Sequence, residues 1–517
     1  MIEIGNTRLG IDKFREIVFD EEKIQLNSEA LEKIDETYNF LSSFSEGKII
    51  YGINTGLGPM AQFRVPEKDL NQLQHNLISS HCCGSGEALD RKQIRSLMLS
   101  RLNSLMQGYS GIHSSAVVLL KDMLNCGIYP LIYEHGGVGA SGDLVQLAHL
   151  ANGMLGEGNV YFNDKICPAK KAFKECGIYP LRIYLREGLA IMNGTSVMSG
   201  IGLLNIINAK NLYVWSLVCS AIINEIVRSY SDHFSAELNR LKHHKGQILT
   251  AKLLRKILKG SKLIRRRADH LYNGSNGHQT VLKDKVQEYY SLRCVPQILG
   301  PVWDTLENAE RIVLDELNSV NDNPIIDKQS NDVFHGGNFH GDYVSFEMDK
   351  LKIAITKLSM LSERQLNFLM NDKLNNILPP FINLGTLGLN FGMQGLQFTA
   401  VSTTAENQTL SYPMYLHSIP SNNDNQDLVS MGTNSALIAK KVIENTYQVV
   451  AIELIALAQA IDYLKIENEL AEFSSEIYGK IRSIVPRFEN DESKYEQLKS
   501  LKDFLYKDHF DLSNLIS

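Results

Sequence analysis

Residues 433–464 read TNSALIAKKVIENTYQVVAIELIALAQAIDYL, and this stretch decides the fold class. Its apolar side chains return every three to four residues, for example at Val450, Leu454, Leu457 and Ile461, which is the spacing of one helix face. The stretch is far longer than an ordinary globular helix. It therefore predicts long helices that pack side by side in a bundle.

The same helical spacing recurs after about residue 193, as at Leu351, Ile355 and Leu358. The chain before it mixes short helical patterns with glycine-rich turns, and residues 156–173 alternate apolar and polar positions as a β-hairpin does. We expect a mainly α protein: a smaller mixed α+β part over residues 1–190 and a long-helix bundle over residues 191–517. No low-complexity linker separates them, so the boundary is soft and the two parts should form one intertwined unit.

The composition is that of a globular protein: of 517 residues, 44% are hydrophobic and 21% are charged. A net charge of −6 gives no general attraction to nucleic acid or to an anionic membrane. Small-molecule substrates fit this balance better. The basic stretch at residues 252–267 also carries apolar residues at helical spacing, so we interpret it as the solvated face of an amphipathic helix.

Cysteine usage and the N-terminus bear on location. The seven cysteines are an odd number and form no CxxC pair suited to zinc or redox chemistry, so reduced thiols are expected. The opening MIEIGNTRLGIDKF lacks the basic and apolar segments of a secretory signal. The longest apolar run, residues 449–461, is shorter than the about 20 residues that cross a bilayer, which predicts a core helix. We expect a cytoplasmic protein.

The string GGVGASGDLVQLAHL, residues 136–150, sets Ala140, Ser141 and Gly142 between glycines that permit unusual backbone angles. Alone, the sequence Ser141-Gly142-Asp143 would predict only a turn and a helix N-cap. Six further strings accompany it: YGINTGLG (51–58), REGLAIMNGTS (186–196), QEYYSLRCVPQ (287–297), NDNP (321–324), GGNFHG (336–341) and SNNDNQDLVSMG (421–432).

Together, and in this order, the seven strings resemble the aromatic amino-acid ammonia-lyases, which include histidine, phenylalanine and tyrosine ammonia-lyases. The resemblance covers almost the whole chain and is greatest to the bacterial tyrosine ammonia-lyases. It implies the long-helix bundle of the aromatic amino-acid lyase and fumarase-like type, with the cofactor loop in the N-terminal part. It also implies a homotetramer whose active sites draw residues from more than one chain.

The resemblance implies that Ala140, Ser141 and Gly142 condense without help into 4-methylideneimidazole-5-one (MIO), with no metal and no external cofactor. The residue types suit this reaction. Gly142 offers an unhindered amide nitrogen, Ala140 a small carbonyl partner, and Ser141 a hydroxyl whose loss leaves a methylidene. In the family this electrophile activates the substrate amine, and a base then removes the β-proton.

The resemblance also assigns residues at the reacting end. Tyr51 corresponds to the base, with Gly58 carried over from the same string, and the phenolate of Tyr51 then needs local stabilisation, which nearby helix N-termini can give. Asn193 resembles the residue that supports the cofactor's carbonyl oxygen. Phe339 is expected to form a wall of the site.

Three residues of the string at 287–297 complete this expectation. Arg293 corresponds to the carboxylate anchor, since a planar guanidinium suits two-point capture of an α-carboxylate. Gln287 and Tyr290 are expected to shape the site beside it.

Two places bear on the substrate. Ser80 and His81 form a pair like that of histidine ammonia-lyases, whereas Gln426 replaces the glutamate that pairs with the imidazole of histidine in those enzymes. Together with Gln426, Asn422 and Asn425 resemble tyrosine ammonia-lyases. We expect His81 to donate a hydrogen bond to a phenolic hydroxyl, which favours conversion of L-tyrosine to trans-4-coumarate. The alternatives are a histidine ammonia-lyase that forms urocanate and a tyrosine 2,3-aminomutase.

The chain departs from the family pattern at one place in the cofactor string. Many family members follow ASGDL with Ala-Pro where this chain has Val145 and Gln146, a change that restores an N–H donor to the following helix.

Other classes of protein fit the sequence less well. The mobile GSSxMPxKxNP loop of the fumarase and aspartase superfamily is absent. The histidine pairs 335/340 and 243/244 lack HExxH spacing for a metal hydrolase. A non-catalytic helical scaffold would leave the polar strings unexplained.

Overall fold

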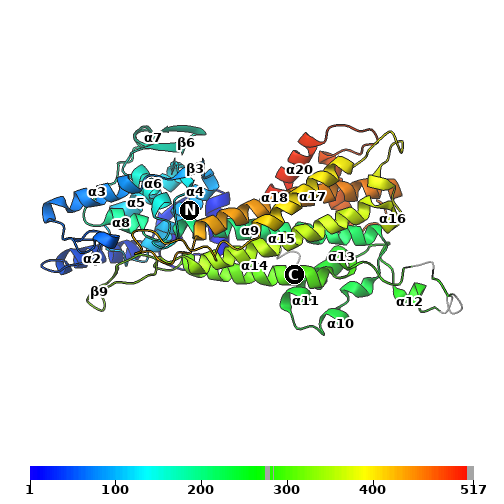
Figure 1. The fold of residues 1–517 in the computed structure, drawn as a ribbon, viewed down its shortest axis with the longest axis horizontal. Coiled ribbons are helices and arrows are strands. Elements are labelled where there is room, and N and C mark those ends of the chain that lie inside the picture. The colour runs from blue at the N-terminus through cyan, green and yellow to red at the C-terminus, as the bar shows by residue number, and fades with distance from the viewer. Residues whose placement is uncertain (274–279, 283–284, 509, 511–517) are drawn as a thin grey trace. The chain divides into compact units, whose positions relative to one another are not determined.

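The computed structural model describes residues 1–273, 280–282, 285–508 and 510, and these residues are mainly helical (Figure 1). Contacts divide the chain into two compact units. The first unit comprises residues 1–205, 309–349 and 413–439, and the second comprises residues 206–308, 350–412 and 440–517. The predicted fold class is confirmed. The boundary expected near residue 190 stays a prediction.

Four long helices contribute residues to both units: α9 (Ser196–Ile226), α14 (Val295–Leu317), α15 (Asp342–Met370) and α18 (Gly432–Leu464) (Figure 1). The helix expected from residue 433 is therefore present. Residues 449–461, predicted to form a core helix, lie within α18. By length and composition alone, helices α9 and α18 could cross a bilayer. However, 94% and 78% of their most apolar windows are buried inside the protein, as in core helices.

Among the shorter helices of the first unit, α3, α6 and α8 pack on one another. Local sequence explains several helix ends. For example, Asp90 and Gln93 form a reciprocal capping box at the start of α4. The shorter helices of this unit are α1 (Ile11–Phe19), α2 (Ser28–Phe44), α3 (Leu70–His81), α4 (Arg91–Leu105), α5 (Ser115–Cys126), α6 (Leu144–Met154), α7 (Ala169–Cys176) and α8 (Glu187–Met192), with 3-10 turns at Gly58–Met60 and Glu67–Asp69.

The strands of the first unit form four small sheets. A parallel pair joins β1 (Ile2–Ile4) to β2 (Ile24–Leu26), and antiparallel pairs join β3 (Ser85–Ala88) to β5 (Tyr133–His135) and β8 (Ile325–Asp327) to β9 (Asp332–Phe334). A three-stranded sheet has the order β4 (Tyr129–Pro130), β6 (Asn159–Phe162), β7 (Lys165–Pro168). The β6–β7 pair, in which Phe162 faces Lys165, confirms the hairpin predicted within residues 156–173.

The second unit is a helical bundle in which buried polar side chains tie neighbouring helices together. Asn407 of α17 donates hydrogen bonds to Ser359 of α15 and to Thr446 of α18 over 3.2 and 3.0 Å. The shorter helices of this unit are α10 (Ala236–Asn239), α11 (Lys245–Ile257), α12 (Arg267–His270), α13 (Tyr290–Arg293), α16 (Asp372–Asn375), α17 (Gln394–Leu410), α19 (Glu472–Ile484) and α20 (Tyr495–Lys507), with 3-10 turns at Ser231–Phe234 and Pro380–Ile382.

The basic stretch at residues 252–267 only partly follows its prediction. Helix α11 buries Leu253, Leu254 and Ile257, as an amphipathic helix does, but it ends at Ile257. The positions after it lie outside the helix until α12 begins at Arg267.

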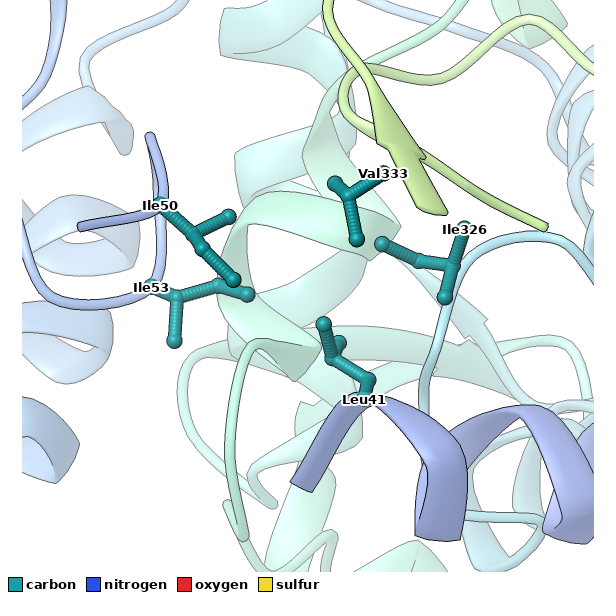
Figure 2. Packing of buried hydrophobic residues seen from close by; sticks show 5 residues of the cluster. All are labelled: Leu41, Ile50, Ile53, Ile326 and Val333. Atoms are coloured by element: carbon teal, nitrogen blue, oxygen red, sulfur yellow. The ribbon is translucent and has the colours of Figure 1, made fainter. Parts of the chain in front are cut away.

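A hydrophobic cluster in the first unit fixes the segment that carries Tyr51. Ile50 and Ile53 of this segment pack with Leu41 of α2, Ile326 of β8 and Val333 of β9 (Figure 2). All five side chains are at most 9% exposed. Because both flanking isoleucines are buried, the backbone around Tyr51 is held against α2 and the β8–β9 hairpin.

Candidate active site

The loop before α6 depends on two close backbone approaches. Gly142 pairs with Gly194 as an isolated parallel bridge, and the Asp143 N–H donates to the Gly194 carbonyl over 2.8 Å. Gly142 has a φ of +66°, and a Cβ on it would lie 2.0 Å from the Gly194 oxygen. Only glycine meets both conditions. The loop 140–142 is therefore held by backbone contacts and has little room to adjust.

The side chain of Asp143 holds this loop in place through hydrogen bonds. Its buried carboxylate accepts the N–H groups of Val197 and Met198 over 2.8 and 3.0 Å, at the start of α9, and a hydrogen bond from the Thr433 hydroxyl at the start of α18. Burial raises the pKa of Asp143 to about 6, although these three donors oppose the shift. The N-terminus of α9 favours the charged form. Asp143 thus ties the loop to two long helices.

A cavity of about 1060 Å³ in the first unit opens beside the loop. Ala140 and Ser141 line it, whereas Gly142 does not. Helix α3 contributes one continuous face to the wall, with residues at helical spacing: Leu73, Asn76, Leu77, Ser80 and His81. The cavity is large enough for an aromatic amino acid.

Tyr51 lies on the cavity wall next to a backbone donor. The N–H of Gly58 donates to the Tyr51 hydroxyl oxygen over 3.2 Å. Gly58 has a φ of +55°, and the amide of Asn422 packs so closely that a Cβ on Gly58 would lie 2.7 Å from its Nδ2. The loops 51–58 and 421–426 therefore meet at the phenol, and a donated N–H stabilises negative charge on its oxygen.

The Ser80–His81 pair has a defined hydrogen-bond pattern. Nδ1 of His81 lies 2.9 Å from the Leu77 carbonyl oxygen and 3.0 Å from the Ser80 hydroxyl. Because a carbonyl oxygen only accepts, Nδ1 carries the proton, and Nε2 of the neutral ring is then an acceptor. This differs from the donor role expected for His81 from the sequence: the geometry suits a ligand group that donates to the ring.

Gln426 links the loop 421–426 to the glycine-rich loop. Its Nε2 donates to the Ser141 hydroxyl over 2.9 Å, and its Oε1 accepts from the Ser421 hydroxyl over 3.1 Å. Between them, residues 422 to 424 all have left-handed backbone angles, with φ from 54° to 60°. Asn and Asp tolerate this conformation better than other residues with a Cβ, which explains the sequence NND at this turn.

Asn193 is nearly fully buried at the cavity wall. Its Nδ2 donates to Asp322 Oδ1 over 3.3 Å and to the Asn323 carbonyl over 3.1 Å. Asp322 is itself paired with the fully buried Arg186, at 3.1 Å. Both acceptors of the Asn193 amide belong to the NDNP string, so two of the strings singled out in the sequence are joined here.

Comparison with known proteins identifies the family. The sequence model of the family described as aromatic amino acid lyase matches residues 9–483. A tyrosine 2,3-aminomutase from Myxococcus fulvus is 38% identical, with 90% of each chain covered, and a histidine ammonia-lyase from Geobacillus sp. (strain WCH70) is 36% identical over 95% of this chain and 94% of that one. The crystal structure of a tyrosine aminomutase from Streptomyces globisporus has a TM-score of 0.94 at 34% identity, covering 98% of this chain and 97% of that one.

The chain belongs to the aromatic amino acid lyase family. It is therefore an enzyme of the carbon-nitrogen lyase type, in a family that includes aminomutases. Family members in general depend on MIO. The residues here fit that group: Gly142 sits where a Cβ has no room, and Ser141 is one of the residues that line the cavity.

Of the site residues that the family resemblance assigned, one set surrounds this cavity: Tyr51, Gly58, Ser80, His81, Ala140, Ser141, Asn193, Phe339, Asn422, Asn425 and Gln426. Gln287, Tyr290 and Arg293 instead belong to the second unit. There Gln287 and Tyr290 line a cavity of about 730 Å³, and the Arg293 guanidinium lies over the Tyr290 ring at 4.7 Å from its centre. The roles assigned to all these residues stay predictions.

The charged side chains in the described lining of the first-unit cavity bear on how it could bind a carboxylate. Its described lining contains Asp427 but no lysine or arginine. An α-carboxylate bound there would have no cation from this lining. In the described part of the chain, no group of three or more His, Cys, Asp and Glu side chains is placed to hold a metal ion.

Several lining residues were missed by the sequence reasoning, which selected polar strings. Most are apolar: Leu57, Met60, Ala61, Phe63, Val65, Leu73, Leu77, Leu144, Leu189 and Leu428. A signal existed for α3, because Leu73 and Leu77 share the face of Ser80 and His81. His335 and His340, considered before only as a metal pair, also line the cavity.

Proposed function

We propose that this protein eliminates ammonia from L-tyrosine to give trans-4-coumarate, with an MIO group that it forms from Ala140, Ser141 and Gly142. The observation that carries the proposal is one cavity lined by Ser141, by Tyr51 and by the polar Ser80–His81 pair. An electrophile, a base and a recognition group for a phenol would thus share one space.

The condensation balances without an oxidant. The Gly142 nitrogen bonds to the Ala140 carbonyl carbon, and that carbonyl oxygen leaves as water with the N–H protons of Gly142 and Ser141. The Ser141 hydroxyl then leaves as a second water with the proton of its own Cα. When formed, the group supplies an electrophile that no side chain offers, and it activates the substrate amine for departure.

Tyr51 is the base in this proposal. It would take the proton from the substrate β-carbon, and the Gly58 N–H at 3.2 Å supports the phenolate that this role requires. The buried Ile50 and Ile53 restrict how far the phenol can move.

The Ser80–His81 pair is proposed to recognise the substrate ring. With the His81 proton on Nδ1, the Nε2 atom is available to accept a hydrogen bond from a phenolic hydroxyl. A phenylalanine ring would leave that acceptor without a partner from the substrate. This favours tyrosine over phenylalanine.

The substrate carboxylate needs a cation that the first-unit cavity does not supply. We propose Arg293 for this role, with Gln287 and Tyr290 beside it, in a homotetramer whose sites use residues from more than one chain. The lack of lysine and arginine in the described lining supports a shared site. We further propose a cytoplasmic location, supported by seven cysteines that are all free thiols.

A second candidate is a tyrosine 2,3-aminomutase, favoured by the 38% identity to the Myxococcus fulvus enzyme of that name. Such an enzyme returns the ammonia to the β-carbon instead of releasing it. A histidine ammonia-lyase is the third candidate, since the chain is 36% identical to one and carries the Ser80–His81 pair.

The experiment is a comparison of purified protein with L-tyrosine, L-histidine and L-phenylalanine, without added metal or cofactor. Near-ultraviolet absorbance follows the unsaturated acid, and chromatography separates β-tyrosine. We expect 4-coumarate and ammonia from tyrosine. Dominant β-tyrosine would support the aminomutase, and urocanate alone would support the histidine enzyme.

A further inference from the structure

Helix α4 carries a buried arginine directly behind the loop that bears Asn193 and Gly194. Arg101 is 0% exposed. Its Nη2 donates to the Ala190 carbonyl over 2.7 Å, and its Nη1 donates to Asn321 Oδ1 over 2.9 Å and to the Ser196 hydroxyl over 3.5 Å. One planar guanidinium therefore connects the end of α8, the NDNP string and the start of α9.

The same guanidinium also lies in close contact with Gly194. A Cβ on Gly194 would lie 2.1 Å from Arg101 Nη1, so the arginine packs against the bare Cα of the glycine. Gly194 in turn meets Gly142, where a Cβ would lie 2.0 Å from the Gly194 oxygen. An unbroken row of contacts thus runs from Arg101 through Gly194 to Gly142.

The group stays a cation inside the protein. Burial is the main reason that the pKa of Arg101 is lowered to about 10; the carboxylates of Asp322 and Asp143 oppose this shift, and the charge of Arg186 contributes to it. Burying an arginine side chain costs free energy. A fully buried arginine with directed hydrogen bonds therefore indicates that the fork-shaped guanidinium is required at this position.

We propose that Arg101 is a positioning residue for the condensation of residues 140–142: it holds Gly194, and through the Gly142–Gly194 bridge it fixes the direction of the Gly142 nitrogen. This inference rests on the proposed function, because it concerns how the proposed group forms. Ring closure requires attack by that nitrogen on the Ala140 carbonyl carbon. A misplacement of about 1 Å slows such an oriented reaction by about 10²-fold.

The test compares two buried arginines of α4. Arg95 is 3% exposed and donates to the Ile17 and Leu124 carbonyls and to the Tyr129 hydroxyl. Arg95→Gln therefore removes a buried guanidinium from the same helix, and none of these hydrogen bonds involves Gly194. Arg101→Gln is the test variant, and Arg101→Lys keeps the charge but loses the fork.

Each chain is made by cell-free translation, and intact mass is followed over time for the loss of two waters. Circular dichroism and thermal unfolding report the folded state of the same samples. We expect the wild type and Arg95→Gln to lose both waters at equal rates, Arg101→Gln to be about 10²-fold slower, and Arg101→Lys to lie between them.

Equal rates for the wild type and Arg101→Gln would overturn the inference, and so would an equal delay in Arg95→Gln, which would mean a general effect of destabilisation. If Arg101→Gln does not fold, the decision rests on Arg101→Lys, for which a wild-type rate counts against the inference. A wild-type chain that never loses two waters would instead refute the proposed function.

Discussion

Nε2 of Gln426 donates a hydrogen bond to the hydroxyl of Ser141 over 2.9 Å. The proposed condensation removes that hydroxyl as water. The amide of Gln426 then loses this partner and becomes available to the cavity, while Ser421 still holds its Oε1 from the other side. In this proposal, Gln426 would contact the loop before the condensation and the substrate after it.

Gln426→Glu is expected to shift the substrate preference toward histidine. A carboxylate accepts a charge-assisted hydrogen bond from an imidazole, which an amide cannot match, and the gain is about 1.5–3 kcal/mol or about tenfold to a hundredfold in the ratio of kcat/KM values. Rates of urocanate and 4-coumarate formation measure this ratio. An unchanged ratio would remove Gln426 from substrate recognition.

His81→Phe is expected to lower kcat/KM for tyrosine relative to phenylalanine by about 10–100-fold, because a buried phenolic hydroxyl would lose its acceptor. Competition between the two amino acids, followed by chromatography of the acids formed, gives the ratio directly. Ser79→Ala is the control, since Ser79 lies on the same helix but does not line the cavity. Equal losses for both substrates would indicate only local unfolding of α3.

Tyr51→Phe is expected to bind substrate but turn it over about 10²–10⁴-fold more slowly, as removal of a base predicts. The ring is retained, so packing on the Gly58 side changes little. Steady-state kinetics separate kcat from KM, and intact mass checks that the loop still loses two waters. A rise in KM with little change in kcat would assign Tyr51 to binding instead.

Glu453→Gln is expected to change the pH dependence of stability. Glu453 is fully buried in α18, and this burial raises the pKa of its carboxyl to about 8 from an ordinary 4.5. The folded state therefore holds this proton more tightly than the unfolded state. Stability falls as the pH rises from about 5 toward 8, and the loss is complete above the folded pKa.

Denaturant unfolding across that pH range measures the free energy of unfolding and so tests the prediction for Glu453. The free energy of unfolding of Glu453→Gln minus that of the wild type should grow with pH and then level off. Glu444→Gln on the same helix is the control, because Glu444 forms an i,i+4 pair with Lys440 at 3.6 Å near the surface. A constant difference at all pH values would contradict the assignment.

The sequence predicted the long helices and one wall of the cavity for physical reasons that are local. Helical spacing fixes which side chains share a face, as with Leu77 and His81. Six of the seven strings that resemble one family contribute residues to one cavity, such as Tyr51 and Ser141, whereas the string at 287–297 does not. Turn chemistry predicted the β6–β7 hairpin.

Other features depend on contacts that spacing does not reveal. The position of Arg101 behind Gly194 joins residues 93 positions apart, and nothing in the helix sequence RKQIRSLMLSRLNSL separates it from a surface arginine. The proton on Nδ1 of His81 follows only from the distance to the Leu77 carbonyl.

The most direct measurement is the intact mass of the purified wild-type chain beside that of Ser141→Ala. The account predicts an active wild-type chain lighter than its sequence by two waters, and an inactive, folded Ser141→Ala chain that cannot lose the water derived from the serine hydroxyl. A wild-type chain of full sequence mass that nonetheless releases ammonia from an aromatic amino acid would contradict it.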